Sequence, residues 1–330
     1  MSRSIDETST PAGAARTGRP RRGADGAGAG SPGRSKGRAG ATDLWHAVPW
    51  TLPALILIFG VVLFPAGYMI YNSTRKISVS GVDHGSVGLQ NYATVLSRPE
   101  LPQILFNTFV WVVVVVALTV VISLMLAQFL NKNFPGRQWV RMAILIPWAA
   151  SVVMTTTVFV YGLDPYYGII NKFLVDIHVL SAPFGFTQQP LPAFLSSIGI
   201  AVFVSLPFTT YTILAGLAGI PGDMLEAAKM DGAGATRTYF GVILPNLRNA
   251  IALASLINII NVFNSLPILK LMTGSIPGYK ADTTTTYVFK LLQGEQRIDL
   301  SSALSVINFA IVLVIVALYL WIVKPMKDVK

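Results

Sequence analysis

EAAKMDGAGATRTYFGVILP, residues 226–245, is a short polar passage between long apolar runs. On either side the chain is nearly free of charged residues over the ~20 positions that a helix needs to cross the hydrocarbon core of a bilayer. A polar passage fixed between two membrane spans is typical of a docking element. It therefore decides how the rest of the chain is interpreted.

The composition is that of a membrane protein. Of 330 residues, 53% are hydrophobic and only 12% are charged, with a mean hydropathy of +0.59, whereas a soluble domain has about 25% charged residues. The absence of cysteine excludes disulfides, thiolate zinc sites and a cysteine nucleophile. We expect an all-α membrane protein with six transmembrane helices and no second large soluble domain.

The chain divides into a tail and a membrane domain. Residues 1–43 are rich in Gly, Ala, Ser and Arg, and such a segment buries too little apolar surface to offset its ordering entropy. We predict a disordered basic tail that sets membrane topology and touches anionic lipid, with no role in binding nucleic acid. Residues 44–330 form the predicted transmembrane domain. Its apolar runs are 50–72, 104–130, 142–163, 194–219, 249–269 and 302–323.

The orientation is predicted from the basic residues. With the N-terminus inside, the inner segments hold 17 Lys and Arg residues and the outer segments hold 8. The tail carries much of this bias. Because basic residues favour the cytoplasmic side, we expect both termini and the loop 220–248 in the cytoplasm.

Within the loop 220–248, two short helices are predicted. Asp223 is expected to cap the first helix, with Glu226 in its first turn, where the helix dipole favours an anion. Ala227 and Ala228 are small helix formers that let another surface approach closely. Gly232 can adopt a left-handed conformation and turn the chain.

The second short helix is expected from about 235 to 244, before Pro245 marks re-entry into the next span. Two short helices at a steep angle form a knob that suits insertion into a groove of a partner protein. The alternative from the residues alone is an ordinary amphipathic connector at the membrane surface.

The same loop resembles the EAA loop of binding-protein-dependent ABC importer permeases. That pattern is Glu-Ala-Ala, three residues, Gly, nine residues, Ile, one residue and Leu-Pro. At the same spacing this chain has Glu226, Ala227, Ala228, Gly232, Val242, Leu244 and Pro245. Val242 replaces the usual Ile, and Asp231 beside Gly232 resembles the form common in carbohydrate permeases.

Other stretches are similar to the maltose-type sugar permeases. They include Phe64-Pro65, the segment 88–92 (GLQNY) and the segment 263–268 (FNSLPI). Lys270 departs from the family, which usually has an aromatic residue at that position. The resemblance covers roughly residues 50–325.

The resemblance implies a type I ABC importer permease fold and a half-transporter in a bacterial-type plasma (inner) membrane. The implied partners are a second, similar permease, two ATPase subunits bound at the EAA loop, and an extracytoplasmic solute-binding protein. It also implies that Glu226 contributes charge to the ATPase contact and that Gly232 permits the turn between the coupling helices. ATP and Mg would be bound by the ATPase subunits, and no cofactor by this chain.

Candidate solute contacts lie mainly on the fifth predicted span. Asn258, Asn261 and Ser265 have the i, i+3, i+7 spacing of one helical face, with Asn264 one step around. Because amides facing lipid would be left unsatisfied, this face should point inward, either to hydrogen-bond a hydroxylated solute or to pack against the partner permease. Three aromatic residues are candidates for stacking on sugar faces or for ordinary packing: Trp148, Tyr161 and Tyr211.

The sequence also limits the source of energy. It has no GxxxxGK[ST] phosphate loop, and no ionisable residue lies inside the predicted spans, where proton-coupled carriers need one. We therefore predict a transport subunit, not an enzyme, with no catalytic residue and no metal site. The alternatives are a permease for a non-sugar solute (polyamine, phosphate or glycerol phosphate), a secondary carrier and, more distantly, a membrane-embedded enzyme.

Overall fold

The computed structural model describes residues 41–274 and 276–323. The predicted tail, residues 1–43, therefore lies almost wholly outside the described residues. The chain divides into two units, 1–57 and 58–330, and the helix described in the first unit is α1 (Ala41–Leu57). Everything that follows concerns the second unit unless α1 is named.

The second unit begins with a widened helical turn. The π-helix η1 (Ile58–Leu63) leads into α2 (Phe64–Ser73). Pro65 lacks the backbone N–H that would bond the carbonyl four residues earlier, which favours such a widened turn. Next comes an antiparallel hairpin of β1 (Arg75–Ile77) and β2 (Asp83–Ser86), followed by α3 (Gln90–Leu96).

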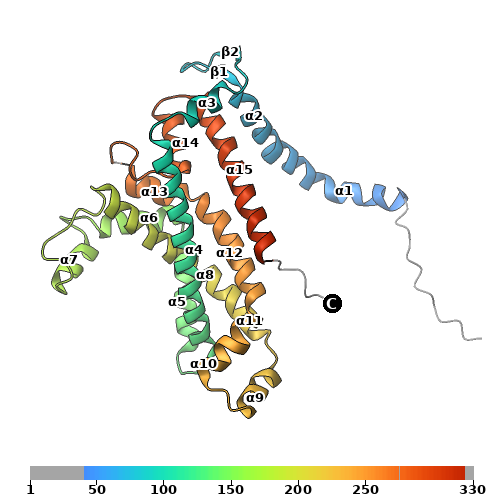
Figure 1. The fold of residues 1–330 in the computed structure, drawn as a ribbon, viewed down its shortest axis with the longest axis vertical. Coiled ribbons are helices and arrows are strands. Elements are labelled where there is room, and N and C mark those ends of the chain that lie inside the picture. The colour runs from blue at the N-terminus through green and yellow to red at the C-terminus, as the bar shows by residue number, and fades with distance from the viewer. Residues whose placement is uncertain (1–40, 275, 324–330) are drawn as a thin grey trace, which may run out of the picture. The chain divides into compact units, whose positions relative to one another are not determined.

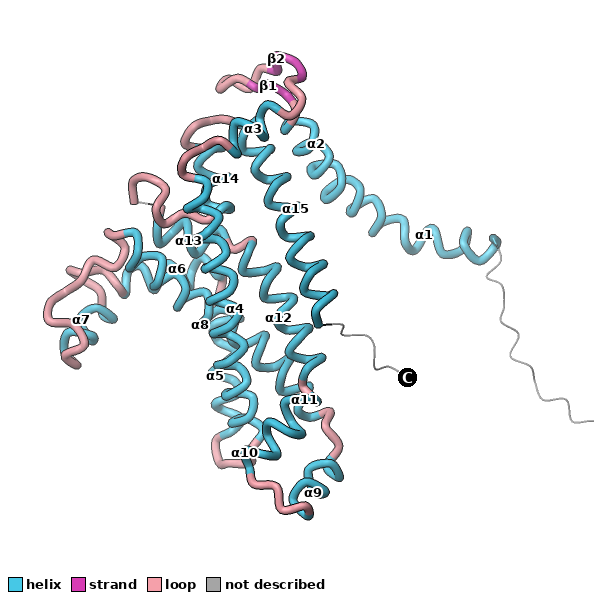
Figure 2. Tube along the Cα trace, in the orientation of Figure 1, coloured by secondary structure: helices cyan, strands magenta, loops and turns pink. Residues whose placement is uncertain are grey.

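Four long helices run along the second unit, and Figures 1 and 2 show three of them, α4, α12 and α15, nearly lengthwise. They are α4 (Leu101–Asn131), α8 (Pro190–Ala218), α12 (Arg248–Phe263) and α15 (Ile298–Val323). The main apolar core lies between α4, α8, α12 and α13 (Leu266–Thr273), around the buried Trp111, Ile200, Phe263 and Met272.

Two of the six predicted spans are broken. The predicted span 142–163 is α5 (Arg137–Ala149) and α6 (Val152–Gly162), which meet at 96°. The predicted span 249–269 is not one continuous helix, because α12 ends at Phe263 and α13 begins at Leu266. Proline at the second position of α13 cannot continue a hydrogen-bonded helix, which favours the break there.

Shorter helices complete the unit. The loop after α6 contains α7 (Ile169–Asp176). The loop between α8 and α12 contains α9 (Gly222–Met230), α10 (Ala235–Thr238), η2 (Tyr239–Ile243) and α11 (Leu244–Asn246). After α13 comes α14 (Thr284–Gln293), which starts with a capping box on Thr283.

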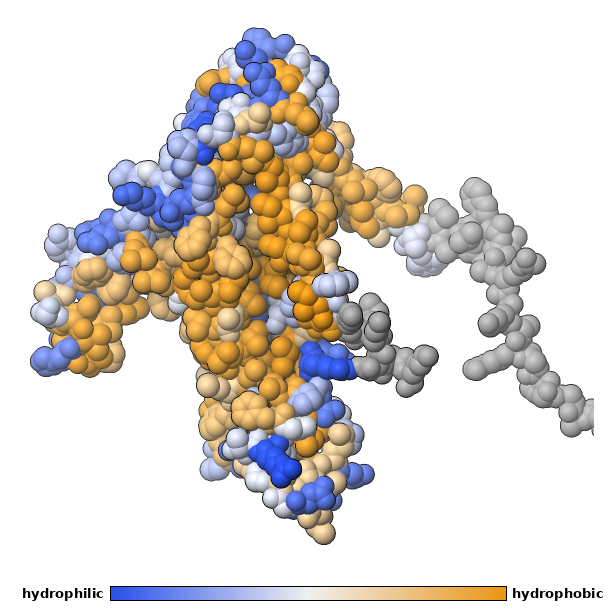
Figure 3. All heavy atoms as spheres, viewed as in Figure 1, coloured by the Kyte–Doolittle hydropathy of each residue, from blue (hydrophilic) through white to orange (hydrophobic). Residues whose placement is uncertain are grey.

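Among the described residues, four helices are long and apolar enough to cross a membrane, or up to six if each bent pair forms one span. Figure 3 shows hydrophobic residues over the middle of the second unit, and hydrophilic residues gathered at the hairpin end and around α9 and α10. This distribution fits an all-α membrane protein with polar ends.

Candidate functional site

A polar cavity of about 370 Å³ lies where the two broken spans meet α8. Its polar lining comes from Ser205 on α8, Asn258 and Asn261 on α12, and Ser265 in the break before α13. Its apolar lining is Trp148, Val152, Ala201, Val204, Phe208, Val262, Pro267 and Ile268. A cavity with several neutral donors and acceptors and one large aromatic ring suits a hydroxylated molecule.

The break between α12 and α13 is stabilised by side chains from other elements. The last carbonyls of a helix lack intrahelical partners and need donors from elsewhere. Trp111, on α4, donates its indole N–H to the carbonyl of Val262 at 2.9 Å. Thr285, on α14, donates its hydroxyl to the carbonyl of Phe263, also at 2.9 Å. The break can therefore persist inside an apolar bundle and expose Ser265 to the cavity.

The two asparagines of α12 have different surroundings. Asn258 is 3% exposed, and its amide nitrogen donates to the hydroxyl oxygen of Thr209 on α8 at 2.6 Å. Asn261, one turn further along, is exposed, and its side chain makes no hydrogen bond to another described residue. Asn258 thus ties two helices together, whereas the amide of Asn261 is available to a ligand.

The remaining predicted contacts are divided. Trp148 lines the cavity and is 63% exposed. Asn264 lies outside the lining and donates its amide to the carbonyl of Ile260. Tyr161 is 73% exposed and likewise does not line the cavity. Tyr211 donates its hydroxyl to the carbonyl of Arg141 at 2.7 Å, beside a smaller cavity that also includes Trp148.

The second candidate site is the group of short helices α9, α10, η2 and α11, here called the foot. Gly232 has φ of 72°, as predicted for the turn. Gly232 N–H donates to the carbonyl of Lys229, and Ala233 N–H donates to that of Ala228, both at 3.0 Å. These two bonds form a Schellman motif, in which a left-handed residue satisfies the free carbonyls at a helix end.

Two local predictions for the foot are wrong. Asp223 does not cap α9, because the helix already starts at Gly222 and no side-chain capping bond is present. Pro221, with its fixed φ, precedes the helix instead. Glu226 consequently lies beyond the first turn, on the second turn of α9.

The foot exposes a charged and apolar surface. Glu226 and Ala227 are exposed, and Met230 is 88% exposed, whereas Ala228 is 9% exposed and faces the body. Among the described residues, Glu226 has no ion-pair partner. An unpaired carboxylate beside small and apolar side chains is suited to a protein contact.

The foot is packed tightly onto the helices that line the polar cavity. Ile243 and Leu247 share an apolar cluster with Ile213 and Leu217 of α8. At Gly216 of α8, an added Cβ atom would lie 2.6 Å from the Cβ atom of Ala250 on α12. The foot therefore packs, through Ile243, against two helices that touch at this glycine.

Comparison with known proteins identifies the family. The sequence model of the binding-protein-dependent transport system inner membrane component matches residues 119–326. The chain belongs to this family. A probable ABC transporter permease of Brucella suis biovar 1 (strain 1330) is 31% identical over 269 residues, which cover 82% of this chain and 93% of the relative.

Other relatives agree with this assignment. The sulfoquinovosyl glycerol transport system permease SmoG of Agrobacterium fabrum is 29% identical, over 87% of this chain and 92% of the relative. The trehalose/maltose transport system permease MalF of Thermococcus litoralis is 28% identical, over 84% of this chain and 93% of the relative. A crystal structure of a bacterial alginate ABC transporter has a similar fold, with a TM-score of 0.75 at 20% identity over 87% of this chain and 96% of that chain.

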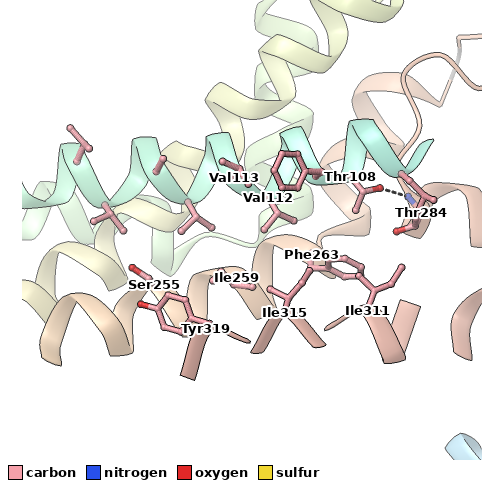
Figure 4. A pocket seen from close by; sticks show the side chains of 16 residues that line it. Thr108, Val112, Val113, Ser255, Ile259, Phe263, Thr284, Ile311, Ile315 and Tyr319 are labelled. Atoms are coloured by element: carbon pink, nitrogen blue, oxygen red, sulfur yellow. Dashed lines mark hydrogen bonds between the residues drawn. The ribbon is translucent and has the colours of Figure 1, made fainter. Parts of the chain in front are cut away.

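This inner membrane component also has apolar cavities that differ from the polar one. One of about 550 Å³ lies between α4, α12 and α15. Figure 4 shows Val112, Ile259 and Ile315 on its walls, with the hydrogen bond between Thr284 N–H and the Thr108 hydroxyl at one end. Its wall is almost wholly apolar and offers few groups that can bond a hydroxyl, unlike that of the polar cavity.

At the hairpin end, a network of charged groups joins the start of α4 to α14 and the segment that follows it. Arg98 forms a bidentate ion pair with Glu295, at 2.9 and 2.7 Å. Tyr287 donates its hydroxyl to Glu100 at 2.7 Å. Burial raises the pKa of Glu100, but the bonds from Tyr287 and Arg98 outweigh it and leave that pKa below its ordinary value of 4.5. The charged forms therefore stabilise this corner.

The sequence alone missed three residues of the polar site. Ser205 was missed because a lone serine in an apolar run gives no signal. Trp111 and Thr285 were missed because they act on carbonyls about 150 and 22 residues away in the chain. One signal was available for the break itself, since the Asn264-Ser265-Leu266-Pro267 sequence contains turn-forming residues before a proline.

Proposed function

We propose that this chain is the membrane-spanning subunit of an ABC importer and forms half of the translocation pathway for a sugar or a related polyol or oligosaccharide. The observation that carries the proposal is the polar cavity at the broken spans, tightly connected to an exposed foot. Energy comes from separate ATPase subunits that dock on the foot.

The substrate class is supported by the lining of the cavity. Asn261 offers both donors and an acceptor, Ser205 and Ser265 offer hydroxyls, and Trp148 offers a ring face. Several neutral groups around an aromatic ring match a neutral polyhydroxylated surface better than a polyamine, which would need carboxylates. The names of SmoG and MalF, both sugar-related, point the same way.

The proposed mechanism is a population shift. Closure of the ATPase subunits on ATP displaces the foot as a rigid body, and the contact at Gly216 moves α8 against α12. The cavity walls Ser205 and Asn258 belong to these same two helices, so the cavity opens to one side of the membrane and then to the other. A second permease supplies the facing half, and an extracytoplasmic binding protein delivers the solute.

Charge reversal at the foot tests this function. In cells carrying the complete transporter, Glu226→Lys should reduce the amount of ATPase subunit that co-purifies with the chain about tenfold or more, because it removes an anion from the centre of the contact. Asp223→Lys is the matched control: it makes the same charge change one turn earlier on the same exposed helix.

The outcome is measured as the ratio of ATPase to permease by quantitative mass spectrometry, together with uptake of labelled trehalose and maltose. Equal loss in both variants would indicate general electrostatics and not a specific contact at Glu226. Full ATPase association with Glu226→Lys would refute docking at this position.

A further inference from the structure

A smaller cavity, of about 200 Å³, lies between α13 and α14, and charged side chains form part of its mostly apolar wall. Leu266 and Lys270 line it from α13, and their four-residue spacing puts them on one face of that helix. Ile268, which lines the 370 Å³ cavity, lies on the opposite face of α13. One short helix therefore separates this cavity from the polar one.

The walls of this second cavity carry an unbalanced positive charge. Two ammonium groups, of Lys270 and Lys290, face a single carboxylate, that of Asp282. Both oxygens of Asp282 are engaged, one by Lys290 at 2.7 Å and the other by the hydroxyl of Thr286 at 2.9 Å. Lys290 also donates to the carbonyl of Gly278, so two of its three N–H groups are engaged.

Lys270 is the charge left over. Its ammonium nitrogen lies 3.5 Å from the centre of the Phe289 ring. Within the described ranges no carboxylate is paired with it. The ring face holds the ammonium from one side and leaves its other N–H donors free. Gln293, an exposed amide on α14, completes the polar lining.

We propose that this cavity binds the acidic group of the transported solute, a phosphate, sulfonate or carboxylate, with Lys270 as the main ligand. The proposal rests on the proposed transport function and deepens it, because the sugars or polyols that the chain takes would include ones with an acidic group. The volume suits a group of a few heavy atoms, and an ammonium with free donors is a general binder of such anions.

The position of the cavity supports this substrate class. Its lysine lies on the same short helix whose other face borders the 370 Å³ cavity, so an acidic group bound there lies beside the proposed solute pathway. Among the similar proteins, SmoG is named for sulfoquinovosyl glycerol, which carries a sulfonate, and a solved transporter imports the acidic polysaccharide alginate.

The test is binding of defined probes to the full chain in nanodiscs of phosphatidylcholine. Inorganic phosphate and D-glucuronate are the acidic probes, and D-glucose is the neutral one, each followed by isothermal titration calorimetry. Lys270→Gln should weaken glucuronate and phosphate binding about tenfold or more, the loss of one charged hydrogen bond. Lys270→Arg should stay within about threefold, and Lys280→Gln, an exposed lysine outside the cavity, should bind as the wild type does.

Three results would overturn the proposal. One is equal binding of glucose and glucuronate, and another is unchanged acid binding in Lys270→Gln with an unchanged unfolding temperature. The third is that the anion bound at Lys270 comes from a lipid. In nanodiscs that contain phosphatidylglycerol, this would appear as Lys270-dependent retention of that lipid without any binding of glucuronate. Glu226→Lys should leave probe binding intact, so failure of ATPase docking and failure of this site are distinguishable.

Discussion

Replacing Asn258 or Asn261 by leucine should affect two different properties of the protein. The residues lie three positions apart on α12 and both line the 370 Å³ cavity. Asn258 is buried and bonded to Thr209, whereas Asn261 is exposed and has no side-chain partner within the described part of the chain. We expect Asn258→Leu to destabilise the fold and Asn261→Leu to impair the response to solute.

The magnitude for Asn258 follows from its hydrogen bond. Removing one partner of a buried bond leaves the other unsatisfied, at a cost of about 1–3 kcal/mol in water-soluble proteins, and interhelical bonds in membranes average about 0.6 kcal/mol. At 2.6 Å and 3% exposure, the bond to Thr209 should contribute about 1 kcal/mol, between the membrane average and the upper part of the range for soluble proteins. Asn261→Leu loses no such bond and should change stability by less than about 0.5 kcal/mol.

The assay pairs unfolding with function. Denaturant unfolding in detergent is measured for Asn258→Leu, Asn261→Leu, Thr209→Val and the Asn258→Leu/Thr209→Val double variant. The cycle formed by the Asn258 and Thr209 variants gives the coupling energy between these two residues directly. Solute-stimulated ATPase activity of the assembled transporter gives the second readout, and only Asn261→Leu should reduce it at unchanged assembly. A coupling energy near zero, or loss of assembly in Asn261→Leu, would refute the division of roles.

Three further predictions concern the supports of the site. Gly216→Val should lower the unfolding temperature and uncouple ATPase activity from uptake, because the new side chain collides with Ala250. Adding Ala250→Gly should partly restore both properties, and unchanged coupling in Gly216→Val would contradict the tight contact. Trp111→Phe should cost about 1–2 kcal/mol in denaturant unfolding through the lost indole donor, and an unchanged midpoint would show that the break needs no cap. Glu100 has a lowered pKa in the folded state, so its contribution to the free energy of unfolding is present above pH 4.5 and is lost as the pH falls further. Glu100→Gln should therefore flatten the dependence of stability on pH in this acid range. An acid transition identical to that of the wild type would show that the bond to Tyr287 contributes nothing.

The foot could be predicted closely from sequence because its signals are local. Gly232 is needed for a left-handed turn, and that turn is present with φ of 72°. The helices α4, α8 and α15 could also be predicted, because a long apolar run without charge must satisfy its own backbone hydrogen bonds in a membrane, and an α-helix does so. The cap assigned to Asp223 failed because Pro221 can start the helix without a side-chain bond.

The polar cavity could be predicted only in part. Helical spacing correctly placed Asn258, Asn261 and Ser265 near one another, and all three line the cavity. Periodicity assumes a continuous helix, however, so the break after Phe263 was missed and Asn264 was placed too close to the lining. Whether an amide bonds a neighbour or a ligand depends on α8, which is remote in sequence, and no local pattern reports that.

If the foot transmits movement generated by a separate ATPase, it must contact that ATPase, and site-directed crosslinking can detect the contact. The chain contains no cysteine, so Met230→Cys introduces a unique thiol at a residue that is 88% exposed on α9. We predict that a maleimide–benzophenone reagent attached to this thiol crosslinks on irradiation to an ATP-hydrolysing subunit, with a yield that changes when ATP is bound. Labelling of the same thiol from outside intact cells, or crosslinks to no nucleotide-binding protein, would show that the foot does not contact an ATPase.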